Sequence, residues 1–269
     1  MPIFPRLGLP APSLKTSFAS LLPRGSCARR LRALLLAVLG LGAAGAHATT
    51  FTVINANDSG AGSLRQAILD ADSDGATNVG GNDTIDFSGV TGTITLASPL
   101  PAIYTELASL TITGPGASLL TVSGANAYTV FTIHSGIEVN ISGLTIADGN
   151  AGSGNGGGIG SSGTLNVSNC AFIGNKGVYG GAIVELNERS PATVIDSTFS
   201  GNSASGQGGA IYTSGVQTTI TGSTFSGNSG SNGGGAIGSP GGQTTITNST
   251  FPAIPPPSAP VAPSGATAR

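Results

Sequence analysis

Three aspartates alternate with other residues at Asp70, Asp72 and Asp74, and Gly75 follows them. This D-x-D-x-D-G spacing is typical of the start of a calcium-binding loop, because carboxylate oxygens at alternating positions are hard ligands that suit Ca²⁺. The twelfth position of such a loop is normally Glu, whereas Gly81 stands there. The run therefore predicts either a calcium site, the only cofactor site that the sequence indicates, or a solvated acidic loop.

A second group of ionisable residues, in the later part of the chain, could serve acid–base chemistry. It consists of Glu185, Glu188, Arg189 and Asp196. Glycoside hydrolysis needs two facing carboxylates, and polysaccharide lyase chemistry needs a positioned base. These residues are also explained as surface charges on an irregular loop. We therefore expect no catalytic residues, and a polysaccharide lyase or glycoside hydrolase acting on an extracellular polymer is the alternative function.

Other catalytic motifs are missing from the sequence. It holds no zinc-ligand spacing, no G-x-S-x-G, no P-loop with its lysine and no Rossmann fingerprint. His134 has no pattern of partner residues around it, and Cys170 stands where later repeats have serine. We interpret Cys170 as a packed structural residue rather than a nucleophile.

A repeat of 26 or 27 residues dominates the second half of the chain. G-G-A-I strings recur in phase with equivalent phenylalanines and asparagines. The recurring residues are Phe172, Phe199, Phe225 and Phe251, with Asn175, Asn202 and Asn228. A fixed period in this range indicates a solenoid. In a parallel coil each strand pairs with the next one about 4.8 Å away, so we expect these side chains to form structural columns.

The local pattern between the repeated residues is that of strands and turns. Apolar residues alternate with Thr and Ser, and Gly, Pro and Asn interrupt the runs. The sequence therefore predicts an all-β fold, a right-handed parallel β-helix with about six coils over residues 90–251. A Gly-rich disordered tail is the alternative, but disorder would not keep several positions in phase.

A cap is predicted over residues 49–89, as a strand, a short helix and the acidic loop. Ser63 can cap the helix, and Gln66 three residues later can complete a capping box. One apolar face would comprise Leu64, Ala67, Ile68 and Ala71. We expect this helix to cover the open N-terminal end of the solenoid.

Both ends of the chain are predicted to lie outside the repeats. Residues 1–48 combine scattered basic residues with an apolar run over 33–46 and a small-x-small end, typical of a secretory signal with an extended basic leader. The alternative is an N-terminal membrane anchor, although 14 residues fall short of the roughly 20 that span a bilayer. Residues 252–269 are Pro-rich and predict a disordered or extended tail.

Charge excludes several classes of partner. After residue 48 the chain keeps 4 basic and 12 acidic residues, a net charge of 4 − 12 = −8. Nucleic acids and anionic membranes bind basic faces, so we expect neither as a partner. We also expect no integral membrane span in the mature chain. Cys170 would be the single remaining cysteine, which excludes an intramolecular disulfide.

Two stretches resemble known bacterial proteins. The sequence G-S-L-R-Q-A at residues 62–67 is similar to the C-S-L-R-E-A motif of exported β-helix proteins, with Gly in place of Cys and Gln in place of Glu. The G-G-A-I and F-x-x-N repeats resemble those of polymorphic outer-membrane proteins, a class of autotransporter adhesins. The resemblance covers about residues 50–251.

This resemblance implies an exported β-helix of the pectin lyase-like kind with a structural or adhesin-like role. Such a protein would be secreted or held at the outer cell surface. We expect the flat faces of its coils, with their Thr, Ser and Asn side chains, to bind surface glycans or the surface of a host or neighbouring cell.

Overall fold

The computed structural model describes residues 47–76, 79–87, 89–104, 107–187, 189–215 and 217–251. The chain divides into two compact units, Met1–Gly45 and Ala46–Arg269, and every described residue belongs to the second. The predicted Pro-rich tail and almost all of the predicted signal lie outside the described residues. Within the described part, no helix has the length and apolarity needed to cross a membrane.

Parallel strands build four sheets in this unit, which we name by their place along each coil. The first face comprises β1 (Thr50–Thr52), β2 (Asn82–Asp86), β4 (Ser109–Thr113), β7 (Glu138–Ser142), β10 (Thr164–Ser168), β14 (Ala192–Ile195), β18 (Gln217–Thr221) and β22 (Gln243–Thr247). The second face comprises β3 (Gly92–Thr95), β5 (Leu120–Ser123), β8 (Thr145–Ala147), β11 (Ala171–Ile173), β15 (Thr198–Ser200) and β19 (Thr224–Ser226).

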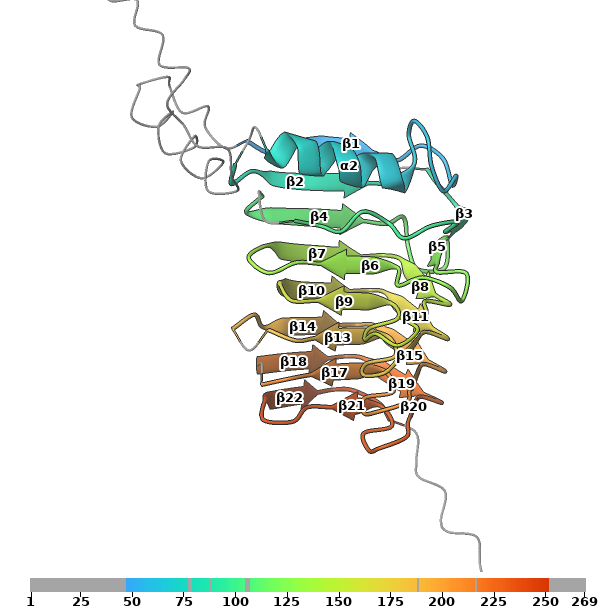
Figure 1. The fold of residues 1–269 in the computed structure, drawn as a ribbon, viewed down its shortest axis with the longest axis vertical. Helices are drawn as coiled ribbons and strands as arrows, with labels where there is room; N and C mark the ends of the chain where they lie inside the picture. Colours follow the sequence, from blue (N-terminus) through green and yellow to red (C-terminus); the bar gives the residue numbers. More distant parts are fainter. Residues whose placement is uncertain are drawn as a thin grey trace, which may run out of the picture. The chain divides into compact units, whose positions relative to one another are not determined.

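Two smaller sheets complete the coils. The corner sheet comprises β12 (Lys176–Gly177), β16 (Ser203–Ala204) and β20 (Ser229–Gly230). The third face comprises β6 (Phe131–Ile133), β9 (Ile159–Ser161), β13 (Ile183–Glu185), β17 (Ile211–Thr213) and β21 (Ile237–Gly238). Neighbours within each sheet come from successive coils, so the strands lie one above another (Figure 1).

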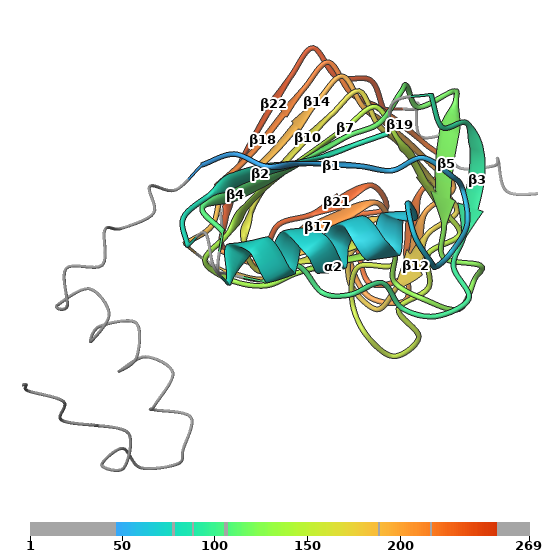
Figure 2. The ribbon, with the colours of Figure 1, turned by 90° about the horizontal axis from the view of Figure 1, so that it is seen from above.

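The chain winds as a right-handed parallel β-helix, which confirms the predicted fold class. Figure 2 looks along the axis from the end that carries β1 and the helix α2 (Leu64–Gly75). From there the chain runs clockwise, from the first face to the second and then to the third, as it recedes. This is the hand that the twist of parallel strands favours.

The core consists of columns of apolar side chains that point inward from each face. On the first face, Ile112, Ile141 and Val167 follow one another in register and are at most 1% exposed. On the second face, the rings of Phe172 and Phe199 stack with their centroids 4.8 Å apart. The same stacking continues through Phe225 to Phe251, at 4.7 and 4.8 Å. Each ring is thus separated from the next by one coil, within the range of favourable aromatic contact.

Glycine is required where the chain turns into the third face. Gly180 and Gly208, the first glycines of two G-G-A-I strings, have φ values of 60° and 68°. A Cβ on Gly208 would lie 2.2 Å from the carbonyl oxygen of Ile211, and one on Gly180 would lie 2.0 Å from that of Ile183. Any larger residue would therefore force the turn open.

The corner between the third and first faces varies in length from coil to coil. Two residues connect β9 to β10, between Ser161 and Thr164, whereas six connect β13 to β14, between Glu185 and Ala192. The following connections have three and four residues. The strands on either side keep their register despite these differences. The third-face strands are not evenly spaced in sequence, because Ile183 follows its partner Ile159 by 24 residues and precedes its partner Ile211 by 28. The 27-residue repeat is therefore the net result of a longer corner here and a shorter connection before the third face.

The helix α2 covers the N-terminal end of the core. Ser63 caps it, with its Oγ accepting a hydrogen bond from the N–H of Gln66 at 3.2 Å. The reciprocal bond of a capping box is absent, because the N–H of Ser63 donates to the carbonyl oxygen of Gly60 at 3.2 Å, and the Gln66 side chain donates to Asp70 Oδ1. The predicted apolar face is buried and comprises Leu64, Ala67, Ile68 and Ala71.

Arg65 fastens this helix to two loops. Its Nη2 lies 2.7 Å from Asp58 Oδ1 and 2.8 Å from the carbonyl oxygen of Ser98, and its Nη1 donates to the carbonyl oxygen of Pro99. Asp58 Oδ1 also accepts from the N–H of Ala97. The arginine of the G-S-L-R-Q-A stretch is therefore a structural clamp between the cap and the first coils.

The stacking predicts that a phenylalanine in the middle of the column contributes much more to the free energy of unfolding than the one at its end. Phe199 is fully buried between two rings, and we expect Phe199→Ala to lower the free energy of unfolding by about 3–5 kcal/mol. Phe251 stacks on one ring only and is 39% exposed, so Phe251→Ala should cost less than about 1.5 kcal/mol. Urea denaturation of both variants measures the difference, and equal losses would contradict the column.

Candidate functional site: the faces of the solenoid

The three aspartates of the predicted calcium run lie in the last turns of α2 rather than in a loop. Successive helical residues are about 100° apart, so Asp72 projects away from Asp70 and Asp74. Asp70 accepts from Gln66, and Asp74 Oδ2 accepts from the hydroxyl of Thr49 at 2.9 Å. No three His, Cys, Asp or Glu residues in the described part of the chain are grouped to hold a metal ion. The helix therefore does not bring the predicted ligands together.

The carboxylates considered for polysaccharide chemistry are also separated. Glu185 ends β13 and is fully buried, whereas Asp196 lies beyond β14 at the corner of the first and second faces. The four residues of β14 alone span about 13 Å, more than the separation of the two carboxyl groups in either class of glycoside hydrolase. Arg189 lies in the intervening connection, and Glu188 is outside the described residues.

Glu185 is a buried carboxyl group with incomplete hydrogen bonding. Its Oε1 accepts from the N–H of Asn187 at 3.2 Å, and its Oε2 has no partner within the described residues. It lies in register with Ser161 and Thr213, both almost fully buried. Burial is the main reason that the pKa of Glu185 rises from its ordinary 4.5 to about 7. The sequence did not reveal this, because the alternation that turns Glu185 inward depends on the register of the third face.

The predicted asparagine column forms a continuous chain of amides, of which Asn175 and Asn202 are fully buried and Asn228 is half-buried. Asn175 Nδ2 donates to Asn202 Oδ1 at 2.9 Å, and Asn202 Nδ2 donates to Asn228 Oδ1 at the same distance. Each Oδ1 also accepts from the backbone N–H of the asparagine one coil earlier, at 3.0 Å. Asn202 Nδ2 donates as well to the carbonyl oxygen of Phe172. These side chains therefore satisfy backbone groups at the turn that follows the second face.

A parallel column of small side chains stands before each phenylalanine. The N–H of Cys170 donates to Ser197 Oγ, and the N–H of Ser197 donates to Ser223 Oγ, each at 3.2 Å. The Cys170 thiol is buried and faces the carbonyl oxygen of Ile141 at 3.7 Å. Burial raises the pKa of this thiol to about 11, so it is protonated at neutral pH and unsuited to nucleophilic attack.

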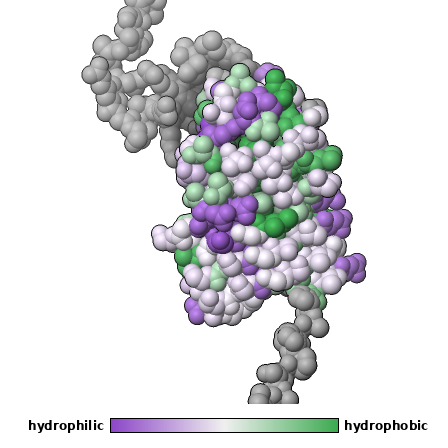
Figure 3. Space-filling view, turned by 90° about the vertical axis from the view of Figure 1, so that its right-hand side faces the viewer, coloured by the Kyte–Doolittle hydropathy of each residue, from purple (hydrophilic) through white to green (hydrophobic). Residues whose placement is uncertain are grey.

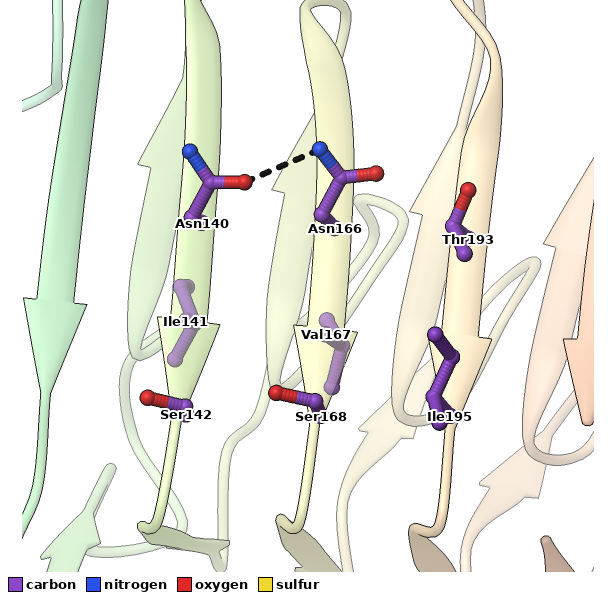
Figure 4. A pocket seen from close by; sticks show the side chains of 8 residues that line it. All are labelled: Asn140, Ile141, Ser142, Asn166, Val167, Ser168, Thr193 and Ile195. Carbon is purple, nitrogen blue, oxygen red and sulfur yellow. Dashed lines mark hydrogen bonds between the residues drawn. The ribbon is translucent and has the colours of Figure 1, made fainter. Parts of the chain in front are cut away.

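The outer surface of the first face carries columns of polar side chains (Figure 4). Asn140, Asn166 and Thr193 form one column, in which Asn166 Nδ2 donates to Asn140 Oδ1 at 2.9 Å. Ser142 and Ser168 belong to a second column, two residues further along each strand. A shallow hollow of about 210 Å³ lies over both.

These columns extend well beyond the hollow. In the coils on either side, the register adds Thr111, Thr219 and Thr245 to the first column. It adds Thr113, Thr221 and Thr247 to the second column, which is interrupted between Ser168 and Thr221 by Ile195, 39% exposed. Figure 3 views a neighbouring side of the solenoid, and there too residues of intermediate hydropathy cover most of the surface between small polar and apolar patches. The chain thus presents flat, repetitive and mainly uncharged polar faces.

A solenoid with stacked Phe and Asn columns and G-G-A-I turns defines the structural class of this chain. A family model described as the Chlamydia polymorphic membrane protein repeat matches residues 196–214 and 222–240. Each matched stretch contains the serine two residues before the phenylalanine, the phenylalanine, the asparagine and the G-G-A-I turn. The repeats are therefore similar to those of polymorphic membrane proteins. No curated protein and no solved structure matches the chain.

The asparagine column predicts that removing the side-chain amide of Asn202 destabilises the fold strongly. Asn202→Ala leaves the N–H and the amide of Asn175 without their acceptor in a buried site, and we expect a loss of about 2–4 kcal/mol of unfolding free energy. Asn166→Ala, in the half-exposed column of the first face, is the matched control and should cost less than about 1 kcal/mol. Similar losses in urea denaturation would argue against the column's role.

Glu185 predicts a pH-dependent stability. Because its pKa is higher in the folded protein, the folded state binds more protons than the unfolded chain between pH 4.5 and about 7, so stability falls as pH rises through this window. The loss should approach roughly 3 kcal/mol and level off above the folded pKa. Glu185→Gln should remove this dependence. Parallel pH profiles of the urea midpoint for wild type and variant would refute the assignment.

Proposed function

We propose that this chain is an exported, surface-displayed β-helix of adhesin type, which binds neutral glycans through its first face. The observation that carries the proposal is the polar column through Asn140, Asn166 and Thr193, which continues unbroken into the coils on both sides. The similarity of its repeats to those of polymorphic membrane proteins supports a role at the cell surface.

The geometry of the first face suits weak, repeated contacts. Hydroxyl and amide groups recur at the coil spacing of about 4.8 Å along the axis, and the two columns are two strand residues, about 7 Å, apart. A single hydroxyl contact with a polymer is weak, but many simultaneous contacts together give a much higher overall affinity. A long flat face therefore binds an extended chain or a cell surface better than a small molecule.

Charge favours neutral partners. The chain after residue 48 has a net charge of −8, which repels acidic polysaccharides, nucleic acids and anionic membranes. On the first face, Glu138 is engaged by the Asn166 amide, at 3.1 Å. Hydrogen bonding rather than charge attraction would thus provide the affinity, and we expect binding to depend only weakly on salt.

Binding of the full chain to immobilised neutral polysaccharides and to whole cells tests this function. The double variant Asn166→Arg/Thr219→Arg adds two long side chains to outward-facing positions of the first face and leaves the core residues unchanged. We expect it to weaken binding about tenfold. Ser200→Arg/Ser226→Arg, at exposed positions of the second face, is the matched control and should change binding less than twofold. Equal effects of the two double variants, or no binding by wild type, would refute the proposal.

A further inference from the structure

The third face carries a notch that is separate from the first face. It has a volume of about 260 Å³, and the residues that line it include Thr132, His134, Asn155, Gly160, Ser162 and Leu186. We call it the third-face notch. Among the described residues that line it, none is Asp, Glu, Lys or Arg.

The notch exists because one coil has small residues in two adjacent columns. Backbone hydrogen bonds from Ser162 N–H to Ile133 and from Leu186 N–H to Ser161 continue the parallel register past the strands. They place Ser162 between His134 and Leu186 in one column. In the other column, Gly160 lies between a threonine and a valine, Thr132 and Val184.

The first of these columns begins with a stack of two rings. Tyr104 and His134 lie with their centroids 4.6 Å apart and their planes 21° apart. Ser162 occupies the next position and is too small to continue the stack. Leu186, 46% exposed, closes the gap on the far side. His134 and Leu186 belong to coils two steps apart, roughly 10 Å, which leaves room for one ring in contact with both.

The polar groups around the gap fit a hydroxylated ring better than an aromatic one. Asn155 Oδ1 accepts from the N–H of Tyr179, while its amide nitrogen makes no hydrogen bond within the described residues. The hydroxyls of Thr132 and Ser162 are likewise unused there. A pyranose ring presents C–H groups that can pack on an imidazole face and hydroxyls at its edge that can bond these groups.

We infer that the third-face notch is a binding subsite for a single neutral hexopyranose, with His134 as its stacking platform. This deepens the proposed glycan-binding function by assigning a second and more selective contact. The described residues that line the notch include no Lys or Arg, so they offer no ammonium or guanidinium group to pair with the carboxylate of a uronic or sialic acid. Asn155, Thr132 and Ser162 would select among hexoses by the orientation of their hydroxyls.

Saturation-transfer NMR of the full chain with the methyl glycosides of glucose, galactose and mannose tests this inference. We expect transfer to the ring C–H protons of at least one glycoside. Gly160→Val should reduce the transfer about tenfold by filling the notch. A Cβ at Gly160 meets only the Asn155 carbonyl oxygen at 3.6 Å, and valine already stands at this position one coil later, so the fold should tolerate it.

Two further variants keep the test independent of one substitution. Ser162→Leu fills the neighbouring column, and His134→Ala removes the platform from an exposed position, and both should reduce the transfer while circular dichroism stays unchanged. Transfer that survives all three substitutions, no transfer to any glycoside, or binding of p-cresol alone as a mimic of a protein aromatic side chain would overturn the inference.

The first-face variant separates this inference from the proposed function. Asn166→Arg/Thr219→Arg should weaken polymer and cell binding about tenfold but leave the methyl glycoside signal unchanged. If wild type binds polymers and cells while no glycoside receives saturation, the notch inference fails and the function of the first face stands. If both double variants bind polymers equally while Gly160→Val removes the glycoside signal, the first-face function fails and the notch stands.

Discussion

In-register pairing of parallel strands is the constraint on which the rest of this structure depends. Each coil lies one strand spacing above the last, so every side chain meets its counterpart from the neighbouring coil. This allows the rings of Phe172, Phe199 and Phe225 to stack and the amides of Asn175 and Asn202 to bond. It also makes the outer surface repetitive, because similar outward-facing side chains recur at equivalent positions on successive strands.

The repeat made much of this predictable from the sequence. A period of 26 or 27 residues fixed which phenylalanines and asparagines would stack, since equal spacing in a parallel coil leaves few other arrangements. The glycines of the G-G-A-I strings were predictable for a similar reason, because their left-handed conformations recur at equivalent turns. The helix and its apolar face followed from local spacing and a serine cap.

Features that depend on irregular segments were not predictable. The D-x-D-x-D-G spacing suggested a loop, but the helix extends through Asp70, Asp72 and Asp74 and directs Asp72 away from the other two. Glu185 was expected among surface charges, yet the strand register turns it inward. The notch at Gly160 and Ser162 depends on pairing between coils whose connections differ in length, which the repeat alone does not specify.

The corner between the third and first faces has a consequence for how such a molecule can diverge. Connections of two, six, three and four residues occur there while the strands on both sides stay in register. Segments inserted or deleted at this corner change the outline of the molecule but leave its scaffold intact. Evolution can therefore vary the length of this edge from coil to coil without disturbing the register of the three faces.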